Sequence, residues 1–250
     1  MPIVIDPLSC CSYLIECMWD GMRLGTATGT ALQHGGKHYL VTNLHVVSGK
    51  NTETGELLDP NGAVPNVLRI AFHVTGRLGN WKWCDILLRD ADMVPLWHAH
   101  PNPAFDVAIV ELDPMPEDAT VYPLDWRLAA TDMIARPGMP VSIIGFPFGL
   151  KSAGLFPIWK TGHIASEPEL NVDRKPVFLI DATTRGGMSG SPVVLRLNSG
   201  YSTSDGREIL AGGFQTRFLG IYAGRIHEDS EIGRVWKPSV VDEILAAAGK

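Results

Sequence analysis

The chain has 250 residues, of which 45% are hydrophobic and 19% charged, with 26 glycines, 18 prolines and a formal net charge of −6. This length and apolar content suffice for a full hydrophobic core, and the frequent turn residues argue against long helices and against disorder. No cluster of Lys and Arg supplies the basic face of a nucleic-acid binder, and no apolar run approaches the roughly 20 residues of a membrane span.

Short apolar or alternating runs follow one another along the chain, separated by Gly and Pro. Their length and their period of two residues are typical of β-strands. Many short strands with such turns favour a sandwich or a barrel. The strands that the pattern predicts are 12–17, 38–42, 67–74, 106–112, 141–144, 177–180, 192–195 and 218–222.

Two segments break this pattern. The segment 114–137 is rich in proline and charge, which indicates a linker between two halves of about equal size. The end of the chain has apolar residues at helical spacing, with Pro238 at a start position and Gly249 at a stop position. We therefore expect a short amphipathic helix over 237–250.

The cysteines and the N-terminus bear on the compartment. Cys10, Cys11, Cys17 and Cys84 crowd one end of the chain, where they form neither a metal-ligand pattern nor a convincing disulfide framework. The segment 1–6 has neither the basic nor the apolar region of a signal peptide. The sequence thus predicts reduced thiols and a cytoplasmic protein, with secretion after removal of a leader as the alternative.

Ser189 lies in a glycine-rich turn, with Gly187 and Gly190 on either side and Pro192 just beyond. Glycines there permit a sharp turn and close approach of a substrate. Such a turn aims successive backbone N–H groups at one point, so those of Gly187 and Ser189 are predicted to form an oxyanion hole. By itself, the motif fits a hairpin with an exposed serine equally well.

His45 is the best candidate among eight histidines for the base that a serine nucleophile requires. It follows the apolar run 39–42 and precedes Val46 and Val47, so it is expected at the end of a buried strand. An oriented imidazole in that position suits a general base. A lone histidine in such a place is more often an ordinary core residue.

Asp106 is the best candidate for the carboxylate that orients this base. It precedes the apolar run 107–110, and an acid at the head of a buried strand is costly without a partner. The alternative is an Asp that caps the turn after Pro103. His45 and Asp106 lie in the first half of the chain and Ser189 in the second, which predicts a site at the junction of the halves.

Taken in this order, the motifs resemble those of the trypsin-like peptidase superfamily, in particular bacterial HtrA-like and related intracellular-type domains. The histidine motif is 40–47, the acid motif 105–110 and the serine motif 187–192, while 218–224 resembles the strand along the specificity pocket. The resemblance covers the chain from about Ser12 onward. It implies one all-β, chymotrypsin-like domain of two antiparallel six-stranded β-barrels, 12–113 and 138–236, with a short C-terminal α-helix.

The resemblance also implies roles for these residues. His45 would act as general base and then general acid, Asp106 would orient it, and Ser189 would be the acylated nucleophile. The protein would be a serine endopeptidase that hydrolyses peptide bonds in polypeptides without a metal or another cofactor. The residues expected to bind substrate are Thr183 at the floor of the specificity pocket, His163 on its wall, and Ala223, Gly224 and Arg225 along the substrate backbone. A surface histidine and a solvated arginine are the alternatives at His163 and Arg225.

Three departures from the family pattern carry predictions. Met188 stands where secreted trypsins have an Asp that receives a freed N-terminus, so activation by N-terminal cleavage is not expected. No cysteine flanks His45 or Ser189, in agreement with a reducing compartment. Thr183 has no charge, so the pocket floor does not favour a basic side chain at the cleaved bond.

The sequence leaves several alternatives. A proteolytically latent or inactive peptide-binding double barrel is the main one, although a binding module needs none of the three predicted catalytic residues. An esterase is disfavoured because the nucleophile elbow Gly-x-Ser-x-Gly is missing. No PDZ-like domain is expected after Trp236. Neither a nucleic acid nor a membrane is an expected partner, and a regulatory protein partner and the oligomeric state are left open.

Overall fold

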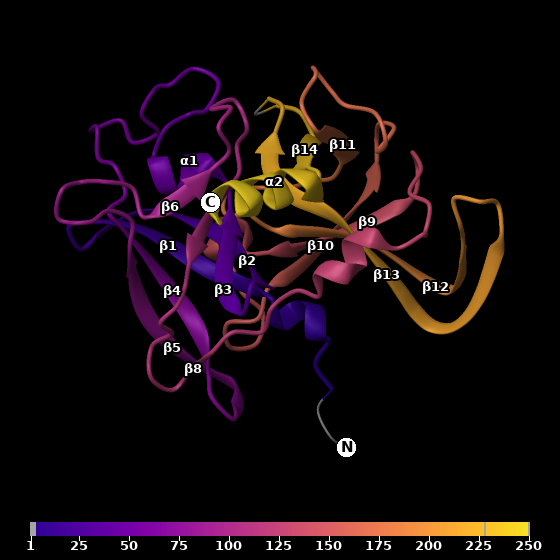
Figure 1. Ribbon diagram of the computed structural model, residues 1–250, viewed down its shortest axis with the longest axis horizontal. Helices are drawn as coiled ribbons and strands as arrows, with labels where there is room; N and C mark the ends of the chain where they lie inside the picture. Colours follow the sequence, from indigo (N-terminus) through magenta and orange to yellow (C-terminus); the bar gives the residue numbers. More distant parts are fainter. Residues whose placement is uncertain (1–3, 228, 250) are drawn as a thin grey trace.

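The computed structural model describes residues 4–227 and 229–249, so the expectation for the segment 1–6 falls partly outside it. The chain forms two β-structures side by side, with a helix near their junction (Figure 1). The first β-structure contains the N-terminal half of the chain, and the second the C-terminal half. The two-part, mostly β architecture predicted from the sequence is confirmed.

The first sheet is antiparallel, with the order β5-β4-β1-β2-β3-β7-β6, and β8 also pairs with β4. It has eight strands rather than the six expected, because two very short strands join it. One of them, β8, pairs where the β4–β5 register shifts after His73. The strands are β1 (Ser12–Trp19), β2 (Met22–His34), β3 (Lys37–Thr42), β4 (Val67–Val74), β5 (Arg77–Leu87), β6 (Trp97–Ala99), β7 (Ala108–Glu111) and β8 (Ala119–Thr120).

The second β-structure is a closed antiparallel barrel with the order β10-β11-β14-β13-β12-β9. It has the six strands that were expected. Its two longest strands, β12 and β13, extend beyond the barrel as a hairpin arm, which Figure 1 shows in orange. The strands are β9 (Pro140–Gly145), β10 (Ile158–Ile164), β11 (Val177–Asp181), β12 (Pro192–Ser202), β13 (Glu208–Arg225) and β14 (Ile232–Trp236).

The short C-terminal helix that the sequence predicts is present as α2 (Pro238–Ala248), within the expected 237–250, with Pro238 in its first turn and Gly249 as its C-cap. Its buried face comprises Val240, Val241, Ile244 and Leu245. The other helices are short: α1 (Leu44–Ser48) and the 3-10 helices η1 (Pro7–Cys10), η2 (Trp126–Ala130) and η3 (Pro147–Gly149). None of the helices in the described part of the chain is long and apolar enough to span a membrane.

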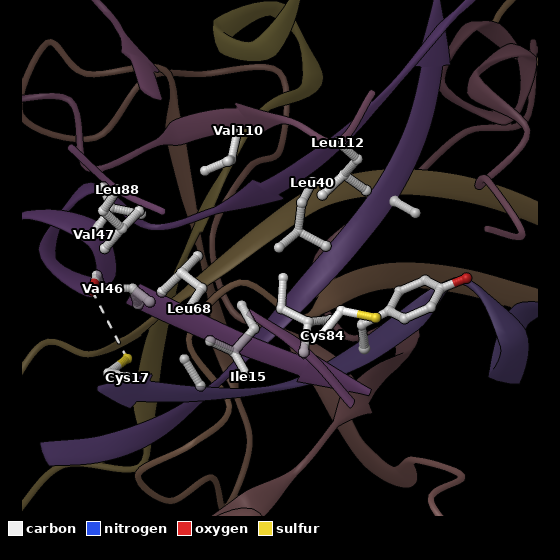
Figure 2. Close-up of a cluster of buried hydrophobic side chains, with 14 of the residues drawn as sticks. Ile15, Cys17, Leu40, Val46, Val47, Leu68, Cys84, Leu88, Val110 and Leu112 are labelled. Carbon is white, nitrogen blue, oxygen red and sulfur yellow. Dashed lines mark hydrogen bonds between the residues drawn. The ribbon is translucent and has the colours of Figure 1, made fainter. Parts of the chain in front are cut away.

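Three clusters of buried side chains form the core. One fills the first β-structure and includes Ile15, Leu40 and Leu68, which point toward one another in Figure 2. Another fills the second barrel. The third joins both halves and the C-terminal helix, and its buried members include Leu32, Val41, Val107, Ile109, Ile144, Val194, Phe218, Ile221, Val240 and Ile244. The two halves therefore share a common hydrophobic interface.

The segment 114–137, which the sequence predicts as a linker, follows β7 in the chain and is packed onto both halves. It contributes β8 and η2, and its residues Leu124 and Met133 are almost completely buried. The four cysteines are all free and buried.

Candidate active site

His45 lies in α1, directly after the buried strand β3. Val46 and Val47 on the same short helix are buried in the first core, which fixes the helix and therefore the ring. Gly49 ends the helix at φ 67°, and a Cβ there would come within 2.6 Å of Pro65. The end of the helix thus requires glycine both for its left-handed conformation and for space.

The structure brings His45, Asp106 and Ser189 into one hydrogen-bonded chain. The Nδ1 atom of His45 lies 2.7 Å from Oδ2 of Asp106, and its Nε2 atom lies 3.1 Å from Oγ of Ser189. The backbone N–H of His45 also donates to Oδ1 of Asp106, at 2.9 Å. Both carboxylate oxygens therefore hold the histidine, one at its ring and the other at its backbone.

The surroundings of Asp106 favour a protonated His45. Asp106 is 7% exposed, and Nδ2 of the buried Asn43 donates to its backbone carbonyl at 2.7 Å. Burial by itself lowers the pKa of His45, but the charge of Asp106 and its hydrogen bond together outweigh burial and raise that pKa above its ordinary value of 6.5. The imidazole is thereby prepared to accept a proton.

The loop around Ser189 depends on its glycines. Gly187 and Gly190 have φ values of 92° and 89°. A Cβ on Gly187 would lie 2.3 Å from the carbonyl oxygen of Phe146, and one on Gly190 would lie 2.0 Å from that of Thr28. Both positions thus exclude any other residue, on grounds of conformation and of space.

The predicted oxyanion donors are the N–H groups of Gly187 and Ser189. The flanking carbonyls are engaged, since Gly186 accepts from the N–H of Phe148 at 2.6 Å and Ser189 accepts from the N–H of Thr28 at 2.8 Å. Within residues 4–227 and 229–249, neither N–H of the predicted pair has a hydrogen-bond acceptor. Two such donors beside a serine hydroxyl can stabilise a negatively charged oxygen.

Strand β2 of the first half holds this loop through threonines that the sequence analysis did not identify. Oγ1 of Thr28 donates to the carbonyl of Gly187 at 2.8 Å and accepts from the N–H of Phe146 at 3.1 Å. Oγ1 of Thr30 donates to the carbonyl of Gly190 at 2.8 Å. Both threonines are completely buried. None of the strands predicted from the sequence covers β2, and the order of residues along a strand does not reveal which loop crosses above it.

Met188 is completely buried in the core of the second barrel. Its side chain thus anchors the loop by apolar packing, at the position where secreted trypsins have an acid. This arrangement needs no ion pair to keep Ser189 and the two N–H groups in place.

The five predicted substrate-binding residues lie in the second half of the chain. Thr183 and His163 are exposed, and Ala223, Gly224 and Arg225 are half-buried at the end of β13. The register between β13 and β14 shifts after Tyr222 and resumes at Arg225. Ala223 and Gly224 therefore lie outside the β13–β14 ladder.

A buried polar pair lies close to these residues, and sequence reasoning missed it. The hydroxyls of Thr184 and Tyr222 are hydrogen-bonded, and both residues are almost completely buried, unlike the exposed Thr183. Burial raises the pKa of Tyr222 to about 12, so its hydroxyl stays protonated. The Tyr222 ring fills the space beside Gly233, where a Cβ would come within 2.5 Å of it. A tyrosine within an alternating strand carries no sequence signal for this role.

Metal binding has no candidate in the described residues, because no group of three or more His, Cys, Asp or Glu side chains there is placed to hold an ion.

Comparison with known proteins adds independent findings. A family model described as "Trypsin-like peptidase domain" matches residues 27–199, more than half of the chain. Comparison with curated proteins gives no match.

Several solved structures share the fold. A serine endoprotease from Yersinia pestis is 14% identical, with a TM-score of 0.58 over 99% of this chain and 67% of that chain. The Rv3671c protease from M. tuberculosis, in its active form, is 18% identical, with a TM-score of 0.51 over 96% and 81%. The thermostable serine protease AL20 from an extremophilic microorganism is 12% identical, with a TM-score of 0.52 over 98% and 100%.

Proposed function

The chain belongs to the trypsin-like peptidase family, and from this premise we propose that it is a serine endopeptidase with His45, Asp106 and Ser189 as its catalytic residues. The observation that carries the proposal is the hydrogen-bonded chain from Asp106 through His45 to Ser189, next to two N–H groups without an acceptor in the described structure. A peptide-binding module would need neither feature.

Acylation follows from this geometry. Nε2 of His45, 3.1 Å from the Ser189 hydroxyl, takes its proton while Oγ attacks the carbonyl carbon of the peptide bond. The N–H groups of Gly187 and Ser189 stabilise the oxygen as it becomes negative. Asp106 holds the ring and stabilises its positive charge. His45 then donates the proton to the leaving nitrogen, the C–N bond breaks, and the acyl group remains on Ser189.

Deacylation repeats these steps with water. His45 takes a proton from water as the water oxygen attacks the acyl carbon, and the proton then passes to Oγ of Ser189 as the C–Oγ bond breaks. The carboxylic acid product leaves, and the hydrogen-bonded chain is restored.

The acyl half of the substrate would lie along Ala223 to Arg225. Ala223 and Gly224 lie outside the β13–β14 ladder, so their N–H and C=O groups are suited to pair with an extended peptide as an added strand. Thr183 and His163, both exposed, would contact the side chain before the cleaved bond. Thr184 and Tyr222 add an uncharged hydrogen-bonding pair in that region.

A fluorophosphonate probe tests the proposal directly. The wild-type protein is expected to gain one covalent adduct, which peptide mass mapping locates on Ser189, and to hydrolyse p-nitrophenyl acetate with an initial burst. Ser189→Ala should lose both the adduct and the burst while its circular dichroism spectrum stays unchanged. A folded wild-type protein without an adduct would favour the peptide-binding alternative, and an adduct on another serine would overturn the assignment of Ser189.

A further inference from the structure

A small hollow beside Ser189 has no role in the steps above. It has a volume of about 230 Å³ and is bordered by both His45 and Ser189. None of Thr183, His163, Ala223, Gly224 or Arg225 borders it. Asp106 does not border it either, although Asp106 and Ala223 share another cavity.

The position of this hollow indicates which half of the substrate it receives. The leaving nitrogen must lie within reach of Nε2 of His45, because that atom donates the proton to it. A cavity that touches both His45 and Ser189, but no residue along the acyl half, is therefore placed to receive the residue that follows the cleaved bond. This step rests on the proposed function.

The walls of the hollow are mostly apolar. They are formed by the β1–β2 hairpin, by α1 and by the loop after α1, and their apolar side chains include Cys17, Leu24, Val46, Leu58 and Pro65. Cys17 is 8% exposed and its Sγ atom points at the carbonyl of Val46, as Figure 2 shows. Burial raises the pKa of the Cys17 thiol to about 12, so the thiol remains neutral and acts as part of the apolar wall.

One charged side chain, Asp59, also borders the hollow, but its carboxylate is engaged by its own turn. Oδ1 of Asp59 accepts from the N–H of Asn61 at 2.8 Å and from that of Ala63 at 3.3 Å. The carboxylate thus helps to form the loop, and its negative charge disfavours an acidic occupant.

The volume decides the size of the occupant. An apolar cavity of about 150 Å³ holds a benzene molecule, and pockets for drug-sized ligands begin at about 300 Å³. A hollow of about 230 Å³ therefore suits one side chain of the size of Leu, Met or Phe.

We propose that this hollow, bordered by Leu24, Leu58 and Cys17, binds an aliphatic or aromatic side chain on the residue directly after the cleaved bond. The substrates would thus be polypeptides with an apolar residue at that position, and a glycine or an acidic residue there would be disfavoured.

An acyl-transfer assay tests the proposal without requiring that the residues preferred before the cleaved bond be known. p-Nitrophenyl acetate acylates Ser189 and releases p-nitrophenol, and an added amino acid amide then competes with water for the acetyl group. The amine nitrogen attacks the acetyl carbon, His45 takes a proton from the amine, and the C–Oγ bond breaks as that proton returns to Ser189. The products are an N-acetyl amino acid amide and the free enzyme, measured by mass spectrometry.

Leucinamide is expected to capture the acetyl group about tenfold better than glycinamide, because its side chain is removed from water in the hollow. The α-amide of aspartic acid should be the poorest acceptor. The reaction of each amine with p-nitrophenyl acetate without enzyme corrects for intrinsic reactivity. Equal capture of leucinamide and glycinamide by a protein that hydrolyses the ester would overturn the proposal.

Two matched variants locate the effect. Leu58→Ser should bring the ratio of leucinamide to glycinamide capture close to one, because Leu58 borders the hollow. Leu57→Ser should keep the wild-type ratio, because Leu57 is similarly exposed, at 42% against 53%, but does not border it. A Leu58→Ser protein with the wild-type ratio would contradict the assignment of the hollow. A wild-type protein that neither releases p-nitrophenol nor reacts with the fluorophosphonate would instead overturn the proposed function on which this inference rests.

Discussion

At the scale of single residues, the site depends on how each polar group is held. Asp106 uses one carboxylate oxygen for the ring of His45 and the other for the backbone of the same residue. Thr28 uses one hydroxyl to satisfy both the carbonyl of Gly187 and the N–H of Phe146. Loss of either group would leave buried polar atoms without partners, which costs more than the hydrogen bond itself contributes.

The pH dependence of activity is expected to report His45. The base must be neutral to accept a proton, so kcat/KM should rise with pH through the pKa of His45. Because Asp106 raises that pKa, the midpoint should lie above the ordinary value of 6.5. A rate profile from pH 5 to 9 with p-nitrophenyl acetate measures it, and a profile that is flat between pH 5 and 8 would contradict the role of His45.

Asp106→Asn separates the effect of the Asp106 charge on the pKa of His45 from the effect of burial. The substitution removes the charge that raises the pKa and leaves burial, which lowers it, so the midpoint should move below 6.5. It also favours the wrong tautomer of the ring, so kcat should fall by about 10⁴-fold, as in the general triad mechanism. A variant with the wild-type midpoint would show that Asp106 does not set the pKa of His45.

Thr28 is expected to position the oxyanion loop. Thr28→Val keeps the shape of the side chain but removes the hydroxyl, so the loop should shift and kcat should fall by about 10²-fold, with KM little changed. Thr28→Ser restores the hydroxyl and should recover most of kcat.

Thr42→Val is the control for Thr28. The hydroxyl of Thr42 is also buried and donates to the carbonyl of Thr28 at 2.9 Å, but it makes no hydrogen bond to the loop around Ser189. Thr42→Val should lower the melting temperature about as much as Thr28→Val does, but with a much smaller loss of kcat. Equal losses of kcat in Thr28→Val and Thr42→Val would reduce Thr28 to a purely structural residue.

At the scale of elements, the loop around Ser189 is held from both halves. Strand β2 binds the carbonyls of Gly187, Ser189 and Gly190 from the first half, while Met188 is buried in the core of the second. The loop is thus ordered by packing and backbone hydrogen bonds that form when the protein folds. That cleavage of the N-terminus is not the switch stays a prediction from the sequence.

Met188 should therefore not tolerate the acid that secreted trypsins have. Met188→Asp buries a carboxylate without a partner and should lower the free energy of unfolding by roughly 3 kcal/mol or more. Met188→Leu conserves volume and polarity and should cost less than about 1.5 kcal/mol. Urea denaturation compares the two, and a Met188→Asp protein as stable as Met188→Leu would show that apolar burial does not anchor the loop.

At the scale of the whole molecule, the two β-structures share one hydrophobic cluster. Val41 and Ile109 from the first half meet Ile144 and Phe218 from the second, and Ile244 of α2 completes the cluster. The candidate site lies across the same junction, since His45 and Asp106 come from the first half and Ser189 from the second. Separation of the halves would therefore expose the shared apolar surface and, at the same time, move Ser189 away from His45 and Asp106.

Unfolding is thus expected to be a single cooperative transition. Tryptophan fluorescence and far-ultraviolet circular dichroism should give coincident urea curves, and esterase activity should disappear over the same range. A first transition that removes activity but keeps most of the circular dichroism signal would show that the halves unfold separately.

The sequence by itself predicted eight of the fourteen strands in the described residues, and it missed β2, β5, β6, β8, β10 and β14. It also predicted the C-terminal helix and the three residues of the hydrogen-bonded chain. It could do so because strand alternation, helix caps and glycine-rich turns are local, and because His45, Asp106 and Ser189 each lie in a short motif. It also identified Met188 as a departure from the family pattern.

Only the tertiary structure decided what surrounds the hydrogen-bonded residues His45, Asp106 and Ser189. The hydrogen bond from Thr28 to Gly187 joins residues 159 positions apart, and the apolar hollow collects residues from two separate segments of the first half together with Ser189. The pair of Thr184 and Tyr222 is buried, whereas the predicted Thr183 is exposed. Such contacts depend on how strands and loops pack in three dimensions, which the alternation of residues along one strand does not encode.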